Sequence, residues 1–205
     1  MKKILTAVSL CLLATSTAFA QTGPEKNPFY FGLSGGQTKI DTGVSGLTGT
    51  ATLDEKDTGY KIFGGLKFDS IWSAELQYVD FGKASLKGNN GDQFRYEGTL
   101  YQFTANNVEV ALKAKSYGAA LLAGYDVNKF IRPYAKVGLH HWRSTESATS
   151  DAGNVAISDS GTDLFYGLGL QFSFNDRIAA RIEAEQYKFD SSKVQLISAG
   201  VTISF

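Results

Sequence analysis

The side chains that most often carry catalysis are scarce in this chain of 205 residues. His140 and His141 are the only histidines, and the only cysteine, Cys11, lies in an apolar stretch near the start. Neighbouring residues of a strand point to opposite faces, so the two histidines diverge and cannot share a metal ion. The run HWRS at 141–144 has the wrong spacing for a histidine that activates a serine, and no other nucleophile is placed beside either histidine. We therefore expect no enzymatic activity, no metal site and no cofactor.

Charged residues of both signs, by contrast, recur at every second position. In residues 177–189, for example, Arg181, Glu183 and Glu185 alternate with small or aliphatic residues. The charges that fall on such mixed faces are Lys61, Lys67, Glu75, Lys136, Asp163, Arg181, Glu183 and Glu185. Four bases and four acids in a confined space are tolerated only when they are paired and hydrogen-bonded. They predict a structural ion-pair network, or alternatively the gate of a narrow pore.

Eight alternating segments could position these charges. They span residues 28–40, 57–68, 71–81, 113–127, 131–143, 162–174, 177–189 and 193–205. Each has at least the roughly 9–11 residues that a tilted strand needs to cross the apolar layer of a membrane. Long and short connections alternate along the chain, except that the last connection is short where a long one would be expected. The tight turns at the other positions therefore share one end of the molecule, as in barrels with short periplasmic turns. The predicted fold class is all-β: an eight-stranded antiparallel up-and-down transmembrane β-barrel.

Aromatic residues indicate which face of the barrel points outward. They mark the strand ends on the apolar face at Phe29, Tyr60, Phe68, Trp72, Tyr78, Tyr117 and Phe174. Such girdles are typical of membrane interfaces. The mixed face is rich in glycine, which suits the narrow lumen of an eight-stranded barrel filled by side chains. The alternative is a soluble barrel with the apolar residues inside and the charges in water.

The start of the chain supplies a route to a membrane outside the cytoplasm. Residues 1–20 read MKKILTAVSLCLLATSTAFA, with two lysines, an apolar run and a small-x-small cleavage site, which predicts a signal peptide followed by a single barrel domain over 21–205. Without Lys2 and Lys3, 18 basic residues face 20 acidic ones. This near-neutral balance gives no reason to expect a nucleic-acid partner.

Several stretches together resemble one known family. These are the signal peptide and the strands IRPYAKVGLHHW, FYGLGLQFSFNDRIAARIEAEQYKF and VQLISAGVTISF. They resemble the OmpA-like transmembrane-domain family of small eight-stranded outer-membrane barrels, which implies the outer membrane of a Gram-negative bacterium. The last strand, ending on Phe205, resembles the signal read by the barrel assembly machinery. Full-length family members carry a peptidoglycan-binding domain after the barrel; no residue follows Phe205 here, so we do not expect cell-wall anchoring.

Two regions at the loop end are candidates for binding. Strand parity places Lys56, Lys113, Lys115 and Arg143 on the outer face near the loops, where they could bind lipopolysaccharide phosphates or could simply be solvated. The longest loop, 82–112, carries four aromatic residues that either pack over the barrel mouth or form a hairpin that adds to a partner's sheet. The loop at 144–161 has no motif and is expected to be mobile.

These observations predict a monomeric barrel with outer-membrane lipid and lipopolysaccharide as its surroundings. Its function would be membrane integrity, or an adhesin-like interaction of the loops with a host-surface or phage ligand. The alternative is a narrow porin-like channel for small solutes.

Overall fold

The protein is described by a computed structural model over residues 27–151, 153–190 and 192–205. The predicted signal peptide and Cys11 lie outside these residues. No helix within the described ranges is long and apolar enough to cross a membrane.

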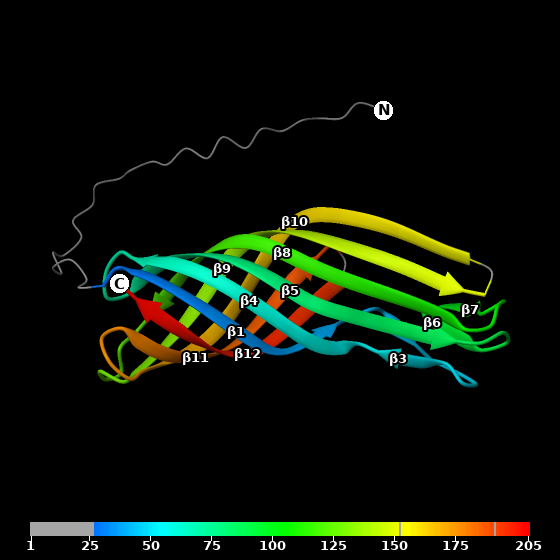
Figure 1. Ribbon diagram of the computed structural model, residues 1–205, viewed down its shortest axis with the longest axis horizontal. Coiled ribbons are helices and arrows are strands. Elements are labelled where there is room, and N and C mark those ends of the chain that lie inside the picture. Colours follow the sequence, from blue (N-terminus) through cyan, green and yellow to red (C-terminus); the bar gives the residue numbers. More distant parts are fainter. Residues whose placement is uncertain (1–26, 152, 191) are drawn as a thin grey trace, which may run out of the picture.

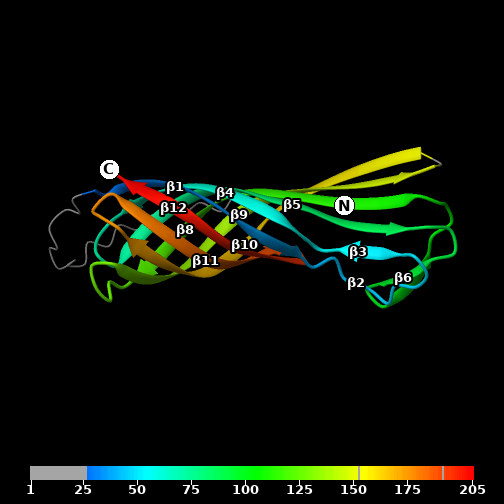
Figure 2. The same cartoon turned by 60° about the horizontal axis from the view of Figure 1, so that its bottom comes forward.

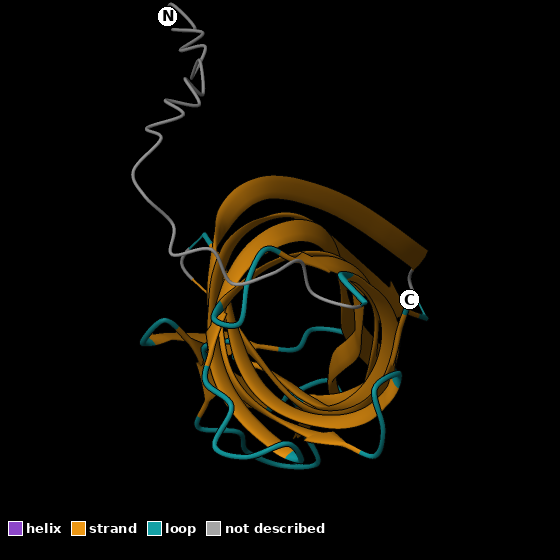
Figure 3. Cartoon of the chain, turned by 90° about the vertical axis from the view of Figure 1, so that its left-hand side faces the viewer, coloured by secondary structure: helices purple, strands orange, loops and turns teal. Residues whose placement is uncertain are grey.

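Eight long strands close into a barrel (Figures 1 and 3). They are β1 (Phe29–Ile40), β4 (Lys56–Lys67), β5 (Trp72–Gly88), β8 (Val108–Gly124), β9 (Ile131–Ser150), β10 (Gly153–Ser173), β11 (Ile178–Phe189) and β12 (Ser192–Ser204). Each pairs antiparallel with its neighbours, and β1 closes the barrel by pairing with both β4 and β12. The predicted fold class is therefore confirmed.

The alternation of side chains sets the two faces of the wall. Apolar residues point outward, so that Leu76 and Leu168 are more than two thirds exposed, at 68% and 69%. Residues on the other face point inward, so that Glu75, the sequence neighbour of Leu76, is buried in the lumen. This arrangement suits lipid outside and paired charges inside, and the soluble-barrel alternative was wrong.

Two glycines show how the narrow lumen is filled. A Cβ atom on Gly36 would lie 1.9 Å from the carbonyl oxygen of Ile197 on the neighbouring strand β12. A Cβ on Gly169 would lie 2.1 Å from the ring of Tyr134, which occupies that position. Glycine is required at both positions because the backbone or a ring occupies the space that a side chain would take.

The three tight turns at the end near Phe205, here called the turn end, share one device. The side chains of Asp69, Asn128 and Asn175 each accept hydrogen bonds from the backbone N–H groups two and three residues later. This is the Asx turn, in which a short side chain replaces a backbone acceptor. The hydrogen bonds from Trp72 and then Ile71 lower the pKa of Asp69 below its usual range, because they favour its charged form.

The opposite end, the loop end, carries further strands. β2 (Val44–Ser45), β6 (Gln93–Tyr96) and β7 (Thr99–Gln102) form a small three-stranded sheet, and β3 (Thr52–Asp54) pairs with β5. Figure 2 shows this small sheet and the β9–β10 hairpin extending beyond the barrel. In the longest loop the aromatic rings pack on one another: the ring centroids of Phe94 lie 5.6 Å from Tyr101 and 5.0 Å from Phe103. The loop therefore forms a β6–β7 hairpin whose aromatic rings pack on one another, and its interaction with a partner's sheet stays a prediction.

The prediction that residues 144–161 form a mobile loop was wrong. Residues 144–150 and 153–161 continue strands β9 and β10, which pair from Phe172↔Ile131 at the turn end to Gly153↔Ser150 at the tip. The segment is rich in Ser and Asp, which obscured the alternation of apolar and polar residues typical of a strand. Its β-branched residues, Val155 and Ile157 included, nevertheless suit a strand, and the ladder with β9 supplies their backbone partners.

Candidate functional site: the lumen and the outer rim

A cluster of ion pairs crosses the middle of the lumen. Its members are Lys61 on β4, Glu75 on β5, Lys136 on β9, and Arg181, Glu183 and Glu185 on β11, all buried. We call these six residues the lumen network. Within the described part of the chain it holds three bases and three acids, so its formal charge is zero.

Each base of the lumen network bridges two or more acids. Lys61 Nζ lies 2.6 Å from carboxylate oxygens of both Glu183 and Glu185. Lys136 Nζ lies 2.8 to 3.1 Å from all three acids. Arg181 joins Glu75 at 2.9 Å and Glu183 at 3.3 Å. The charges are thus fully interlinked, which is the condition under which a buried ion cluster is tolerable.

Tyrosines on the surrounding strands complete the hydrogen bonding. The Tyr30 hydroxyl donates to Glu75 at 3.3 Å, and the Tyr187 hydroxyl donates to Glu185 at 3.0 Å. Arg181 Nε donates to the Tyr134 hydroxyl at 2.7 Å, while its guanidinium lies 4.5 Å from the ring centroid of Phe63. These contacts hold the guanidinium in a single orientation.

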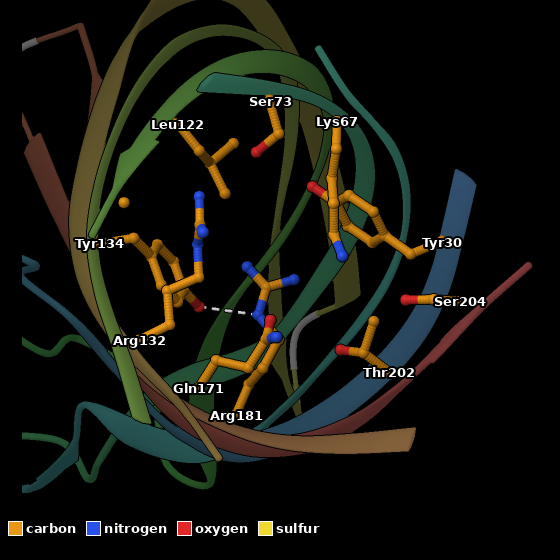
Figure 4. Close-up of a pocket in the computed structure, with 11 residues that line it drawn as sticks. Tyr30, Lys67, Ser73, Leu122, Arg132, Tyr134, Gln171, Arg181, Thr202 and Ser204 are labelled. Carbon is orange, nitrogen blue, oxygen red and sulfur yellow. Dashed lines mark hydrogen bonds between the residues drawn. The ribbon is translucent and has the colours of Figure 1, made fainter. Parts of the chain in front are cut away.

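Two of the eight predicted lumen charges lie outside the network. Lys67 is six residues beyond Lys61, roughly 20 Å along the strand at about 3.3 Å per residue. It lines a small cavity of about 30 Å³ at the turn end, together with Arg132 and Tyr134 (Figure 4). Asp163 lies towards the loop end, where it accepts hydrogen bonds from Trp142 Nε1 at 2.9 Å and the Asp190 N–H at 3.0 Å. Strand parity placed Lys67 and Asp163 on the lumen face, but it could not give their positions along the barrel axis.

A layer of aromatic rings lies between the lumen network and the loop end. Its members are Phe81, His140, Trp142, Phe165, Tyr187 and Phe189. Phe165 stacks on Tyr187 with centroids 4.9 Å apart, and Phe81 meets Tyr187 edge-on at 4.8 Å. Sequence reasoning missed this layer, although Tyr187 and Phe189 continue the alternation that begins with Glu185. Network and rings together fill the barrel over much of its length.

The two histidines diverge as strand parity predicts. His140 is buried in the aromatic layer, with Nε2 2.9 Å from the Lys188 carbonyl oxygen. His141 lies on the outer wall, with Nδ1 3.0 Å from the Thr162 hydroxyl.

Basic residues surround the outer wall near the loop end. Lys56, Lys113, Lys115 and Arg143 are all exposed there. The register sets like charges directly opposite one another in four pairs within the described ranges: Lys39↔Lys56, Lys83↔Lys113, Lys115↔Arg143 and Lys188↔Lys193. We call these eight residues the cationic belt. Two acids offset part of this charge, because Asp80 lies 3.2 Å from Lys115 and Asp163 lies 3.9 Å from Lys188. The sequence alone missed half of the belt because pairing across strands cannot be read from spacing.

The aromatic residues predicted to form girdles all point outward. Phe29, Tyr60, Phe68, Trp72, Tyr78, Tyr117 and Phe174 are exposed by 40 to 67%. Phe205 is exposed too, while its backbone N–H donates to the Phe29 carbonyl oxygen at 2.8 Å.

Comparison with protein families agrees with this geometry. The model of the family described as outer membrane protein beta-barrel domain matches residues 7–205. The chain belongs to this family. Its localisation in the Gram-negative outer membrane is confirmed, and the relatives named next confirm its likeness to OmpA-type proteins. Barrels of this kind have short periplasmic turns and longer extracellular loops, so we name the turn end the periplasmic end and the loop end the extracellular end.

Relatives of this outer-membrane protein support the same conclusion. Outer membrane protein P5 of Haemophilus influenzae is 29% identical over 199 residues, covering 89% of this chain and 50% of P5. The chain thus spans about half the length of the curated relatives it matches. Ail of Yersinia pestis, solved in complex with the heparin analogue sucrose octasulfate, shares the fold with a TM-score of 0.53 and 19% identity, covering 87% of this chain and 99% of Ail. The N-terminal barrel of Pseudomonas aeruginosa OprF shares the fold with a TM-score of 0.54 and 14% identity, covering 87% of this chain and 98% of the OprF barrel.

Proposed function

We propose that this protein is a closed barrel that works through its outer surfaces, as a structural and adhesive component of the outer membrane, and not as a channel or an enzyme. The observation that carries the proposal is the filled lumen. Lys61, Lys136 and Arg181 each bridge two or more carboxylates across it, and aromatic rings cover them on the extracellular side. An eight-stranded barrel has little room beyond its own side chains.

Planar-bilayer recording tests this against the alternative of a narrow channel. The purified protein should show no stable conductance steps. Steps that persist, and that change in size in Lys61→Met, would mean that the ion pairs open to let solutes pass and would support the channel instead.

The cationic belt supports lipopolysaccharide as a structural partner. Like charges directly opposite each other on a sheet are destabilising, so four such pairs favour an anion between them. Phosphate accepts charge-assisted hydrogen bonds from Lys and Arg, and long basic side chains reach the interface from the wall. In this proposal the phosphates of outer-leaflet lipopolysaccharide neutralise the belt.

A charge-reversal experiment tests this lipid interaction. Lys113→Glu/Lys115→Glu should lower the unfolding temperature more in vesicles that contain lipopolysaccharide than in vesicles without it. The matched control is Lys129→Glu/Arg177→Glu at the periplasmic end, where the two kinds of vesicle should give equal shifts. An equal shift for the Lys113/Lys115 variant would count against lipopolysaccharide binding.

The β9–β10 hairpin supports an adhesive role. β10 pairs with β9 along its whole length, but its pairing with β11 runs only from Phe165 to Ser173. Among the described residues no strand pairs with the other edge of residues 153–164, and Val155 and Ile157 there are exposed by 63% and 66%. An open edge with apolar side chains can accept an extended segment of another protein.

A cell-adhesion assay tests the adhesive role of the β9–β10 hairpin. Cells that display Val155→Lys/Ile157→Lys should adhere less to a host-cell layer than cells that display the parent protein. Ser147→Lys/Thr149→Lys is the control that should adhere normally, because both residues lie on β9, which is paired with β8 on one side and β10 on the other. Unchanged adhesion by the hairpin variant would remove the open edge from the proposal.

Assembly and oligomeric state complete the proposal. β12 pairs with both β11 and β1, so it joins the two ends of the barrel sheet. We propose that this strand and Phe205 are recognised by the barrel assembly machinery, and that the folded barrel is a monomer. Phe205→Ala should slow insertion in cells without changing the stability of protein that has already folded.

A further inference from the structure

A pocket of about 420 Å³ lies at the extracellular mouth, separate from the lumen network and from the open edge of β10. One wall is aliphatic and comes from β3, β5 and β8 through Leu53, Leu86 and Leu112. The facing wall is aromatic and comes from β6 and β7 through Phe94, Tyr96 and Tyr101. In Figure 2 the β2 and β6 strands of the small sheet lie beside β3 at this mouth. The volume falls in the range of small-molecule sites, about 300–1,000 Å³.

The charges at this pocket are negative. Asp41, just after β1, and Glu146 on β9 both line it, and none of the described residues that line it is basic. Within the described ranges no Lys or Arg forms an ion pair with Glu146. The electrostatic character of the pocket is therefore opposite to that of the cationic belt on the outer wall.

The aromatic wall is fixed before any ligand arrives. Asp92 accepts hydrogen bonds from the Thr50 N–H at 3.1 Å, the Thr50 hydroxyl at 2.7 Å and the Asn89 N–H at 3.0 Å, which fastens the first extracellular loop to the second. The β2–β6 pairing, Val44↔Tyr96, adds a second link between these loops. A wall that is already ordered lowers the entropic cost of binding.

We propose that this pocket binds a small organic cation with an apolar body, such as an aromatic quaternary ammonium compound. The aliphatic wall would bury the apolar body. The ring faces of Tyr96 and Tyr101 attract a cation, and the carboxylates of Asp41 and Glu146 supply the opposite charge. An anion of the same shape would meet the same carboxylates and be repelled. The inference is independent of the proposed structural and adhesive function, since neither the closed lumen nor the open strand edge contributes to it.

Binding of benzyltrimethylammonium to the protein in neutral maltoside micelles tests the proposal, because these micelles carry no competing cation. Calorimetry should show saturable binding, with amide NMR shifts confined to the residues around the pocket. Glu146→Gln and Asp41→Asn should each weaken binding by roughly 5–10-fold, up to about 1.4 kcal/mol. Glu109→Gln is the matched control: this carboxylate pairs with Lys87 at 3.4 Å and does not line the pocket, so binding should be unchanged.

Phenylmethanesulfonate, of similar size and opposite charge, completes the test and should not bind. The proposal is overturned if the sulfonate binds as well as the ammonium compound, if binding does not saturate, or if Glu146→Gln/Asp41→Asn binds like the parent. Glu146 is an exposed residue, so the single variant keeps the test valid even if the double variant folds poorly. The faster migration of unboiled protein on a gel reports folding of every variant.

Discussion

The pair Arg181 and Glu75 offers the sharpest test of the lumen network. The two residues lie on β11 and β5, their charged atoms are 2.9 Å apart, and their side chains are 2% and 0% exposed. Arg181→Met leaves three acids and two bases in the lumen network, and Glu75→Gln leaves two acids and three bases. Breaking a buried pair on one side costs about 3–5 kcal/mol, because the remaining charge is buried without compensation.

The double variant Arg181→Met/Glu75→Gln restores the balance at two bases and two acids. Its loss of stability should fall short of the sum of the single losses by about 2–3 kcal/mol, which is the upper part of the range for contacting residues. Urea unfolding in lipid vesicles, followed by tryptophan fluorescence, measures all four corners of the cycle. Far-ultraviolet circular dichroism checks that each variant forms the barrel.

An exposed ion pair gives the matched control cycle. Lys87 and Glu109 lie 3.4 Å apart on β5 and β8 with side chains 56% and 38% exposed, and their coupling should be no more than about 1 kcal/mol. If the Arg181/Glu75 cycle is additive, or no larger than this control, then the lumen charges are not held by mutual pairing and the reasoning is refuted.

Three further outcomes follow from individual contacts. Gly36→Ala should destabilise the barrel by about 1–3 kcal/mol through overpacking, whereas Gly35→Ala, whose Cβ would have no neighbour closer than 3.5 Å, should change urea stability little. Tyr187→Phe keeps the ring stacked on Phe165 but leaves Glu185 and Gln77 without the hydroxyl partner, so urea unfolding should show a loss of about 1–3 kcal/mol, and no loss would contradict the hydrogen bonds. The hydrogen bonds from the Asn89 N–H, then from the Thr50 hydroxyl and N–H, lower the pKa of Asp92 in the folded protein. Because the folded pKa lies below the unfolded one, about 3.9, these hydrogen bonds stabilise the fold fully above the unfolded pKa. That stabilisation is lost as the pH falls through the folded pKa. The protection factor of the Thr50 amide, which is its exchange rate corrected for the intrinsic rate at each pH, should therefore fall in acid in the parent, and Asp92→Asn should flatten that dependence.

Much of the wall could be predicted from the sequence because its signal is local. A period of two residues reveals each strand, its apolar face and its aromatic ends, and the tight turns carry their Asx residues at fixed offsets. The inward direction of Lys61, Glu75, Lys136 and Arg181 followed from strand parity once the aromatic residues had indicated the outward face. So did the opposite directions of His140 and His141.

What the sequence left open depends on register between strands that are distant in the chain. Arg181 meets Glu75 across 106 positions and Lys136 meets Glu75 across 61, and no spacing rule foretells which charges share one height in the barrel. Lys67 and Asp163 share the lumen face yet lie towards opposite ends of it. The belt pairs, such as Lys83↔Lys113, and the pocket beside Glu146 likewise exist only once the barrel has closed. The sequence by itself thus determines the strands, because alternation is a property of neighbouring residues. Which side chains meet to form the lumen network, the cationic belt and the pocket is decided by the hydrogen-bond register of the closed sheet.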